Sequence, residues 1–222
     1  TGFGRNGHAS HRCNRTPRLV LPRRYPTRFQ LTSHKFIICA ESVRVYLSVH
    51  FDATLLYWIT VTSLLTVDIG NTNITIGAFT DQELTATWRL ATRETRTIDE
   101  HAWALKGVLQ SKGVEPSSFD AVVICSVVPP LTEDYVDALS SLTDVTPLVI
   151  GPGVRTGIRI HYDRTQDVGA DRIVDAVAAH QLYGGPIVVV DIGTATVFDA
   201  ITAEGDYIGG AISPGMEIAA DA

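Results

Sequence analysis

From residue 64 onward, hydrophobic and polar positions follow an orderly pattern along the chain. Leu64–Ile69 is a short apolar run with Asp68 near its end, and alternating positions follow at 74–78 and, beyond a polar turn at 80–83, around Trp88 and Leu90. Such alternation is typical of strands that bury one face. The pattern therefore predicts a β-meander at the start of this region.

After the meander, helical and strand-like patterns take turns. Residues 98–110 have the apolar spacing of a helix, and 121–128 form a nearly continuous apolar stretch closed by Pro129 and Pro130, as a buried strand would be. Similar patterns predict helices over 131–142 and 170–183 and strands over 146–150 and 187–191. Because strands and helices alternate, the sequence predicts the α/β fold class.

A repeat relates two parts of this region. Shifting the sequence by 123 positions lays Asp68–Thr72 on Asp191–Ala195, and two acidic residues of the following turn recur at the same distance. An internal duplication is the simplest explanation, with a first half at 64–186 and the start of a second half at 187–222. If the halves are comparable, about ninety residues of the second half lie beyond this sequence.

The first 63 residues differ from the rest in charge and pattern. They carry nine basic and two acidic side chains, a net charge of +7, whereas 64–222 carry a net charge of −13. Because 1–63 show no sustained period, we predict a basic extension that is disordered or not native, with the true start near Val61. An acidic body repels a phosphate backbone, so we expect it to bind no nucleic acid.

Neither the apolar runs nor the cysteines indicate a membrane or extracellular protein. The longest mostly apolar run, Ala53–Val67, is interrupted by threonines and is shorter than the roughly eighteen residues of a membrane span. Cys13, Cys39 and Cys125 are odd in number and lack CxxC spacing, which favours neither a zinc knuckle nor a disulfide framework. A cytoplasmic location without a membrane span is predicted.

The two repeated turns have the composition of a phosphate-binding loop. Gly70 and Gly193 let the backbone approach a ligand closely, and the neighbouring Asn and Thr supply donors beside backbone N–H groups. Asp68 and Asp191 cannot bind phosphate directly but suit a cation, or the water around one, that bridges to phosphate. A hairpin with a capping Asp would explain one such turn, whereas two matching copies favour a nucleotide clamp.

Four motifs together resemble the type III pantothenate kinase family, within the superfamily of acetate and sugar kinases, heat-shock chaperones and actin. They are Asp68–Thr72, Gly169–Arg172, Asp191–Ala195 and Gly209–Gly215. The resemblance covers 64–222 and implies a duplicated ribonuclease H-like, actin-like ATPase fold. The family's later region, including a substrate-contacting Thr, has no counterpart here, so we expect this length of chain to be weakly active or inactive.

The resemblance implies ATP-dependent phosphorylation of pantothenate to 4′-phosphopantothenate, the first step towards coenzyme A. It also implies magnesium with the ATP, a monovalent cation (potassium or ammonium) at Asp191, and a homodimer whose partner subunit helps to form the pantothenate pocket. The implied ATP-binding residues are Asp68, Ile69, Gly70, Asn71, Thr72, Asn73, Ile74, Thr75 and Thr194. The implied pantothenate-binding residues are Tyr162, Gly169, Ala170, Asp171 and Arg172, with Asp171 as the proton acceptor.

The chemistry of the reaction supports these roles, although simpler interpretations exist. A hydroxyl that attacks a γ-phosphate needs alignment and a carboxylate to take its proton, and the fork of Arg172 suits a substrate carboxylate. Alternatively, Asp171 is a helix N-terminal acid paired with a base, and Arg172 forms a surface salt bridge. We interpret Trp88, Trp103 and Cys125 as core residues.

Two other functions compete with the kinase assignment. One is a non-catalytic regulator, because a relative of these kinases is an accessory transcription factor and the basic extension could contact nucleic acid. The other is a sugar or acetate kinase of the same superfamily. The intact Asp171 and both phosphate loops argue against the regulator. The Gly169–Arg172 segment and the short interval before the second loop argue against the other kinases.

Overall fold

The computed structural model describes residues 61–222 except 82, 152–153, 163 and 222. All of them belong to His34–Ala222, the second of two units into which the chain divides. The basic extension predicted for 1–63, with Cys13 and Cys39, therefore lies almost wholly outside the described residues and stays a prediction.

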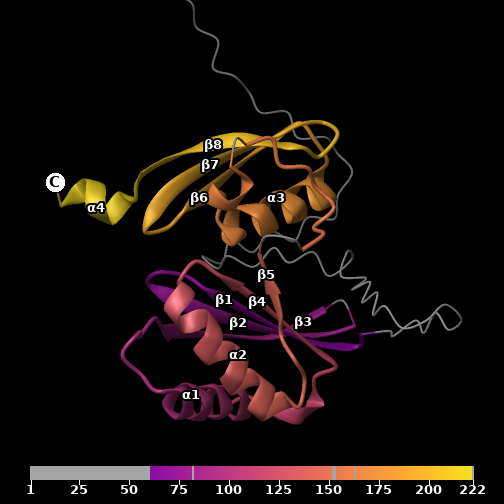
Figure 1. Ribbon diagram of the computed structural model, residues 1–222, viewed down its shortest axis with the longest axis vertical. Helices are drawn as coiled ribbons and strands as arrows, with labels where there is room; N and C mark the ends of the chain where they lie inside the picture. The colour runs from indigo at the N-terminus through magenta and orange to yellow at the C-terminus, as the bar shows by residue number, and fades with distance from the viewer. Residues whose placement is uncertain (1–60, 82, 152–153, 163, 222) are drawn as a thin grey trace, which may run out of the picture. The chain divides into compact units, whose positions relative to one another are not determined.

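The first part of the described chain forms a five-stranded sheet in the order β3-β2-β1-β4-β5 (Figure 1). Its strands are β1 Ser63–Ile69, β2 Asn73–Thr80, β3 Glu83–Ala91, β4 Ala121–Ser126 and β5 Leu148–Ile150. The first three pair antiparallel, which confirms the predicted meander, whereas β4 pairs parallel with β1 and β5 parallel with β4.

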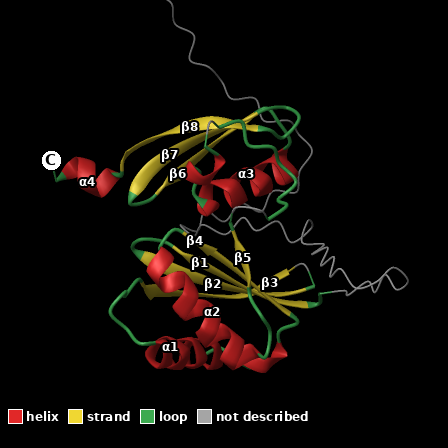
Figure 2. Ribbon diagram, in the orientation of Figure 1, coloured by secondary structure: helices red, strands yellow, loops and turns green. Residues whose placement is uncertain are grey.

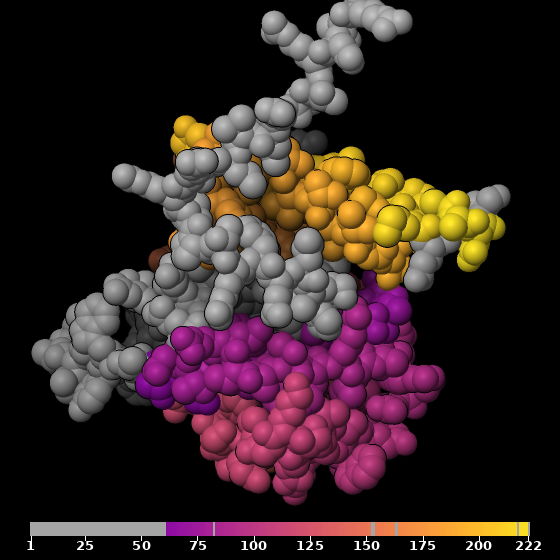
Figure 3. All heavy atoms as spheres, turned by 180° about the vertical axis from the view of Figure 1, so that it is seen from behind, coloured from indigo at the N-terminus to yellow at the C-terminus, as the bar shows by residue number. Residues whose placement is uncertain are grey.

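Helices α1 (Ile98–Gln110) and α2 (Pro129–Thr143) lie together on one face of this sheet (Figure 2). The core between helices and strands contains Leu65, Ile124 and Leu139, each fully buried. Seen from behind, the residues coloured indigo to pink form one close-packed body (Figure 3). The predicted and observed bounds of α1 agree, because Thr97 and Glu100 form a capping box at its start.

Helix α2 begins two residues before its predicted start, at Pro129. The sequence pattern predicts that Pro129 and Pro130 close the preceding strand, whereas in the structure they occupy the first turn of the helix. Proline is compatible with the first turn of a helix, because the backbone N–H groups of that turn have no partner within the helix and the one that proline lacks is not missed.

A second, three-stranded antiparallel sheet has the order β6-β7-β8. Its strands β6 (Ile187–Ile192), β7 (Ala195–Ile201) and β8 (Tyr207–Pro214) recur at nearly the predicted shift from β1, β2 and β3, which confirms the duplicated α/β unit. Helix α3 (Ala170–Tyr183) packs on one face of this sheet (Figure 2). The remaining elements are the 3₁₀ turns η2 Pro116–Ser118 and η3 Thr165–Asp167 and the short helix α4 Met216–Ala220.

The two faces of the second sheet differ in character. On one face Val188, Val190 and Ile192 alternate along β6 and are 61%, 48% and 58% exposed. The other face carries Asp191 and Asp199, because directly paired residues share a face and Asp199 pairs with Val189. The face packed with α3 therefore also carries the carboxylates of β6 and β7.

The two tryptophans of the described residues have different surroundings. Trp88 is 8% exposed and Cys125 is 5% exposed, as predicted for core residues. Trp103 is 81% exposed, so its assignment to the core is wrong. The buried positions of α1 are His101, Leu105 and Leu109, and a step of about 100° per residue places 103 on the opposite face of the helix.

The imidazole of His101 is buried against the ring of Tyr135, with ring centroids 4.8 Å apart. Neither ring nitrogen has a hydrogen-bond partner within the described part of the chain. Burial lowers the pKa of His101 below its ordinary value of 6.5, although the nearby Asp134 acts in the opposite direction. The neutral imidazole is therefore the form that the folded core accepts.

We predict that this histidine makes the fold less stable in acid. Because the unfolded chain takes up the proton more readily, stability is complete above pH 6.5 and declines as the pH falls through the lower pKa of the folded state. Urea unfolding of the full chain between about pH 8 and about pH 5 measures this decline. His101→Phe should flatten it, and an equally steep decline in that variant would contradict the assignment to His101.

No helix in the described ranges is long and apolar enough to cross a membrane.

Candidate active site

The first predicted phosphate loop, between β1 and β2, is held closed by backbone contacts. The N–H of Gly70 donates to the carbonyl of Asn73 at 3.0 Å, and the Thr92 hydroxyl donates to the carbonyl of Gly70 at 2.6 Å. A Cβ at Gly70 would lie 3.1 Å from the Asn73 oxygen, so glycine suits this turn. Asn71 and Thr72 are exposed at its tip.

The other predicted residues of this loop are part of the strands that carry it. Ile69 and Ile74 are fully buried and Thr75 is 5% exposed. Asp68 is half-buried on β1 and lies opposite Thr75 on β2. These residues anchor the loop, and the side chains that reach the surface at its tip are polar.

The second predicted phosphate loop meets the first one. The hydroxyls of Thr72 and Thr194 share a hydrogen bond of 2.8 Å. The N–H of Gly215 donates to the Thr194 carbonyl at 3.2 Å, and a Cβ at Gly215 would collide with the carbonyl oxygens of Gly193 and Thr194. The last glycine of the Gly209–Gly215 motif thus supports the second loop, and the two repeated turns lie together.

The predicted pantothenate motif forms the start of α3. Gly169 is the N-cap, Ala170 begins the helix, and Asp171 lies in its first turn. Oδ1 of Asp171 accepts the backbone N–H of Arg172 at 2.8 Å. An acidic side chain in the first turn of a helix interacts favourably with the helix dipole.

Arg172 turns away from Asp171 and binds Asp199 on β7. Its Nε and Nη2 donate to Oδ1 of Asp199 at 2.9 Å and 2.6 Å, and the two side chains are 10% and 3% exposed. The alternative of a surface salt bridge for Arg172 is therefore wrong. Burial disfavours its charge, but the hydrogen bonds and the charge of Asp199 outweigh burial and raise the pKa of Arg172.

Tyr207 completes this buried group. Its hydroxyl donates to the same Oδ1 of Asp199 at 2.7 Å, and its ring lies 5.7 Å from the guanidinium carbon of Arg172. Burial, and then the hydrogen bond to Asp199, raises the pKa of Tyr207 above its ordinary value. The phenol therefore keeps its proton and remains a donor at neutral pH.

Tyr162 lies near this group and is 40% exposed. A Cβ at Gly209 would lie 3.6 Å from its ring, which places Tyr162 beside the strand β8 that also carries Tyr207. The segment that carries Tyr162 is attached to the second sheet, since Arg159 and His161 both pair with Asp206. The structure thus brings together the predicted pantothenate-binding residues.

The carboxylates of the described residues do not form a metal cage. Within those ranges no group of three or more His, Cys, Asp or Glu side chains could hold a metal ion. Asp191 lies half-buried on β6. The donor set fits a cation that shares its coordination with phosphate, backbone carbonyl or water oxygens, as magnesium commonly does at nucleotide sites.

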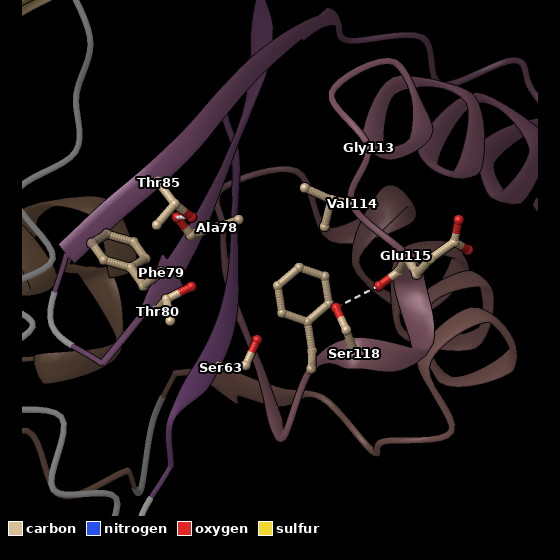
Figure 4. A pocket seen from close by; sticks show the side chains of 10 residues that line it. Ser63, Ala78, Phe79, Thr80, Thr85, Gly113, Val114, Glu115 and Ser118 are labelled. Atoms are coloured by element: carbon tan, nitrogen blue, oxygen red, sulfur yellow. Dashed lines mark hydrogen bonds between the residues drawn. The ribbon is translucent and has the colours of Figure 1, made fainter.

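A cavity of about 330 Å³ lies elsewhere, beside η2 and the strands β1 to β3 (Figure 4). Its wall includes Phe79, Thr85, Val114 and Ser118, and the Ser118 hydroxyl donates to the Glu115 carbonyl at 2.6 Å. None of its lining residues belongs to the four motifs, so this cavity is no part of the candidate active site.

A model of the family "Type III pantothenate kinase" matches residues 64–222. The chain belongs to the type III pantothenate kinase family. It is 48% identical over 159 residues to the type III pantothenate kinase of Moorella thermoacetica and 46% identical over 159 residues to that of Dehalococcoides mccartyi strain BAV1. These matches cover 72% of this chain but 63% and 60% of the two relatives, so the chain spans less than two thirds of their length.

Among solved structures, a Campylobacter jejuni protein described as a Baf family transcriptional activator is 22% identical, with a TM-score of 0.41. The match covers 69% of this chain and 55% of that protein.

Sequence reasoning missed two polar residues at the candidate active site, Asp199 and Tyr207. A signal was present, because Asp199 is the one charged residue within the mostly apolar Ala195–Ile201 segment. A carboxylate in such a strand is buried only when it is paired. The sequence does not say which base pairs with it.

Proposed function

We propose that the protein phosphorylates pantothenate with ATP and forms 4′-phosphopantothenate and ADP. Family membership supports a kinase of this type. The meeting of Thr72 and Thr194 supports the placement of the phosphates at the two repeated turns, because hydroxyl and backbone N–H donors suit phosphate oxygens.

The observation that carries the proposal is the separation of Asp171 from Arg172. Arg172 is paired with Asp199, and within the described residues Asp171 takes part in no ion pair. The alternative for Asp171, a helix acid paired with a base, has no such base in the described structure. A half-buried carboxylate without a basic partner is suited to accept a proton.

In the proposed reaction the primary hydroxyl of pantothenate attacks the γ-phosphorus. A new oxygen–phosphorus bond forms, the bond between the γ-phosphorus and the bridging oxygen breaks, and ADP leaves. Asp171 accepts the hydroxyl proton. Most of the acceleration of such a transfer comes from alignment and from neutralisation of phosphate charge, which we assign to the two loops.

Cations supply part of that neutralisation when they are bound. We propose that magnesium accompanies the ATP phosphates and that Asp191 contributes to a site for potassium or ammonium. Asp191 is on the sheet face that also carries Asp199, which supports its placement at the site. We also propose a homodimer whose second subunit contributes to the pantothenate pocket.

We expect Asp191→Asn to weaken the response to the monovalent cation. With potassium replaced by sodium, the unmodified enzyme should slow markedly, whereas Asp191→Asn should be slow in both salts because a neutral amide holds the cation less firmly. Initial rates at constant ionic strength measure this. Equal stimulation by potassium in both proteins would place the cation elsewhere.

The kinase assay uses a protein of the relatives' length, because this chain spans 63% of the Moorella thermoacetica relative. The extended protein is this chain followed, after Ala222, by the C-terminal segment of that relative. Its ADP release should depend on pantothenate and should not respond to acetate or glucose. Release with a sugar or acetate alone would favour another kinase of the superfamily.

A further inference from the structure

A single buried carboxylate oxygen organises the start of α3. Oδ1 of Asp199 accepts Nε and Nη2 of Arg172 and the hydroxyl of Tyr207, at 2.9 Å, 2.6 Å and 2.7 Å. Charge-assisted hydrogen bonds to a guanidinium are directional as well as strong. Asp199 therefore fixes both the position of the Arg172 side chain and the rotation of its fork.

Gly210 provides the space for this ion pair. It lies opposite Asp199 in the register of β7 and β8. A Cβ at Gly210 would lie 2.5 Å from Nη2 of Arg172 and 2.6 Å from Oδ1 of Asp199. The first part of the Gly209–Gly215 motif is thus explained by the pair that it packs against, without any contact to a nucleotide.

Stability alone is a poor explanation for such a pair. Taking both charges out of water is costly, and apolar replacements of similar size are often as stable or more stable. The free-energy cost of burying the two charges is explained if the ion pair holds a substrate-binding side chain in a fixed geometry. Arg172 directly follows Asp171 in the predicted pantothenate-binding motif at the start of α3, so the group held here belongs to the candidate active site.

We propose that Asp199 is the positioning residue that orients Arg172 toward the carboxylate of the substrate. This inference rests on the proposed pantothenate kinase function. Asp199 occupies Nε and one N–H of Nη2, and Nη1 has no hydrogen bond to any described residue. The Nη1–Nη2 edge is then available for a two-point contact with a carboxylate, so selectivity for an acid over its neutral amide depends on Asp199.

The test compares pantothenate with its primary amide, which lacks the negative charge, as substrates of the extended protein. Asp199→Asn should raise the KM for pantothenate by about 10- to 100-fold and should leave the KM for the amide and for ATP nearly unchanged. Tyr207→Phe keeps the ring and removes one donor, so it should shift the same KM by about 3- to 10-fold. Asp120→Asn, at a carboxylate that accepts hydrogen bonds from Thr62 and Ser63 away from the four motifs, is the control and should shift neither KM.

Each outcome has a distinct meaning. Equal changes in KM for the acid and the amide, or no change for either, would show that Asp199 is merely structural and would overturn the inference alone. If Asp199→Asn fails to fold, the Tyr207→Phe comparison decides. If the unmodified protein phosphorylates neither compound, the result contradicts the proposed function and therefore also the positioning role of Asp199.

Discussion

Replacing Asp171 by Asn should lower kcat of the extended protein by about 100- to 10,000-fold, the usual contribution of a general base. Oδ1 of Asp171 accepts a backbone N–H at the start of α3, and an Asn side chain can preserve that contact. The amide cannot take up the hydroxyl proton. The KM values for ATP and pantothenate should change little, because binding does not require the proton transfer.

Asp99→Asn is the matched control, because Asp99 occupies the corresponding second position of α1, far along the chain from the four motifs. Both substitutions remove a favourable charge from a helix N-terminus and should cost about 0.3–1 kcal/mol of stability. Only Asp171→Asn should lower kcat by the factor given above. Equal activity of the two variants would mean that Asp171 is a helix-terminal acid and nothing more.

Gly210→Ala should destabilise the second sheet by about 3 kcal/mol or more, at the upper end of the cost of overpacking. The added Cβ would collide with the carbonyl oxygen of Phe198 and would press on Arg172 and Asp199. Backbone atoms of a paired strand cannot move aside as the end of a flexible side chain can. Urea unfolding of the full chain measures the loss.

Gly107→Ala is the control for this substitution. A Cβ at Gly107 in α1 meets nothing within 4 Å, so the same change should stabilise the chain by about 0.5–1 kcal/mol through the higher helix propensity of alanine. The two variants should therefore move the unfolding midpoint in opposite directions. A Gly210→Ala chain as stable as the unmodified one would contradict the close packing around the ion pair.

The elements most accurately predicted from sequence are those with a strong local cause. Residues 98–110 combine helical apolar spacing with a capping Thr and Glu, and the observed helix has the same bounds. The three strands of the meander recur as β6, β7 and β8, because the same pattern of apolar runs and polar turns occurs twice in the sequence. Neighbouring residues determine where these helices and strands begin and end, so their sequence is sufficient to predict them.

The site was predicted less completely, because its contacts join residues that are distant in sequence. Arg172 and Asp199 are 27 positions apart, and Thr72 and Thr194 are 122 apart. Composition and spacing identified one member of the first pair and both members of the second, but no pattern specified which groups meet. Trp103 failed for another reason, since hydrophobic character does not reveal which side of a helix faces the core.

The proposed kinase activity is tested most directly by ³¹P NMR of the product that the extended protein forms from ATP and pantothenate in potassium buffer. A new phosphomonoester resonance on the pantothenate 4′-oxygen should appear in step with ADP, and Asp171→Asn should form it at least about 100-fold more slowly. A folded protein that binds ATP and forms no phosphomonoester would contradict the kinase assignment and favour a non-catalytic regulator.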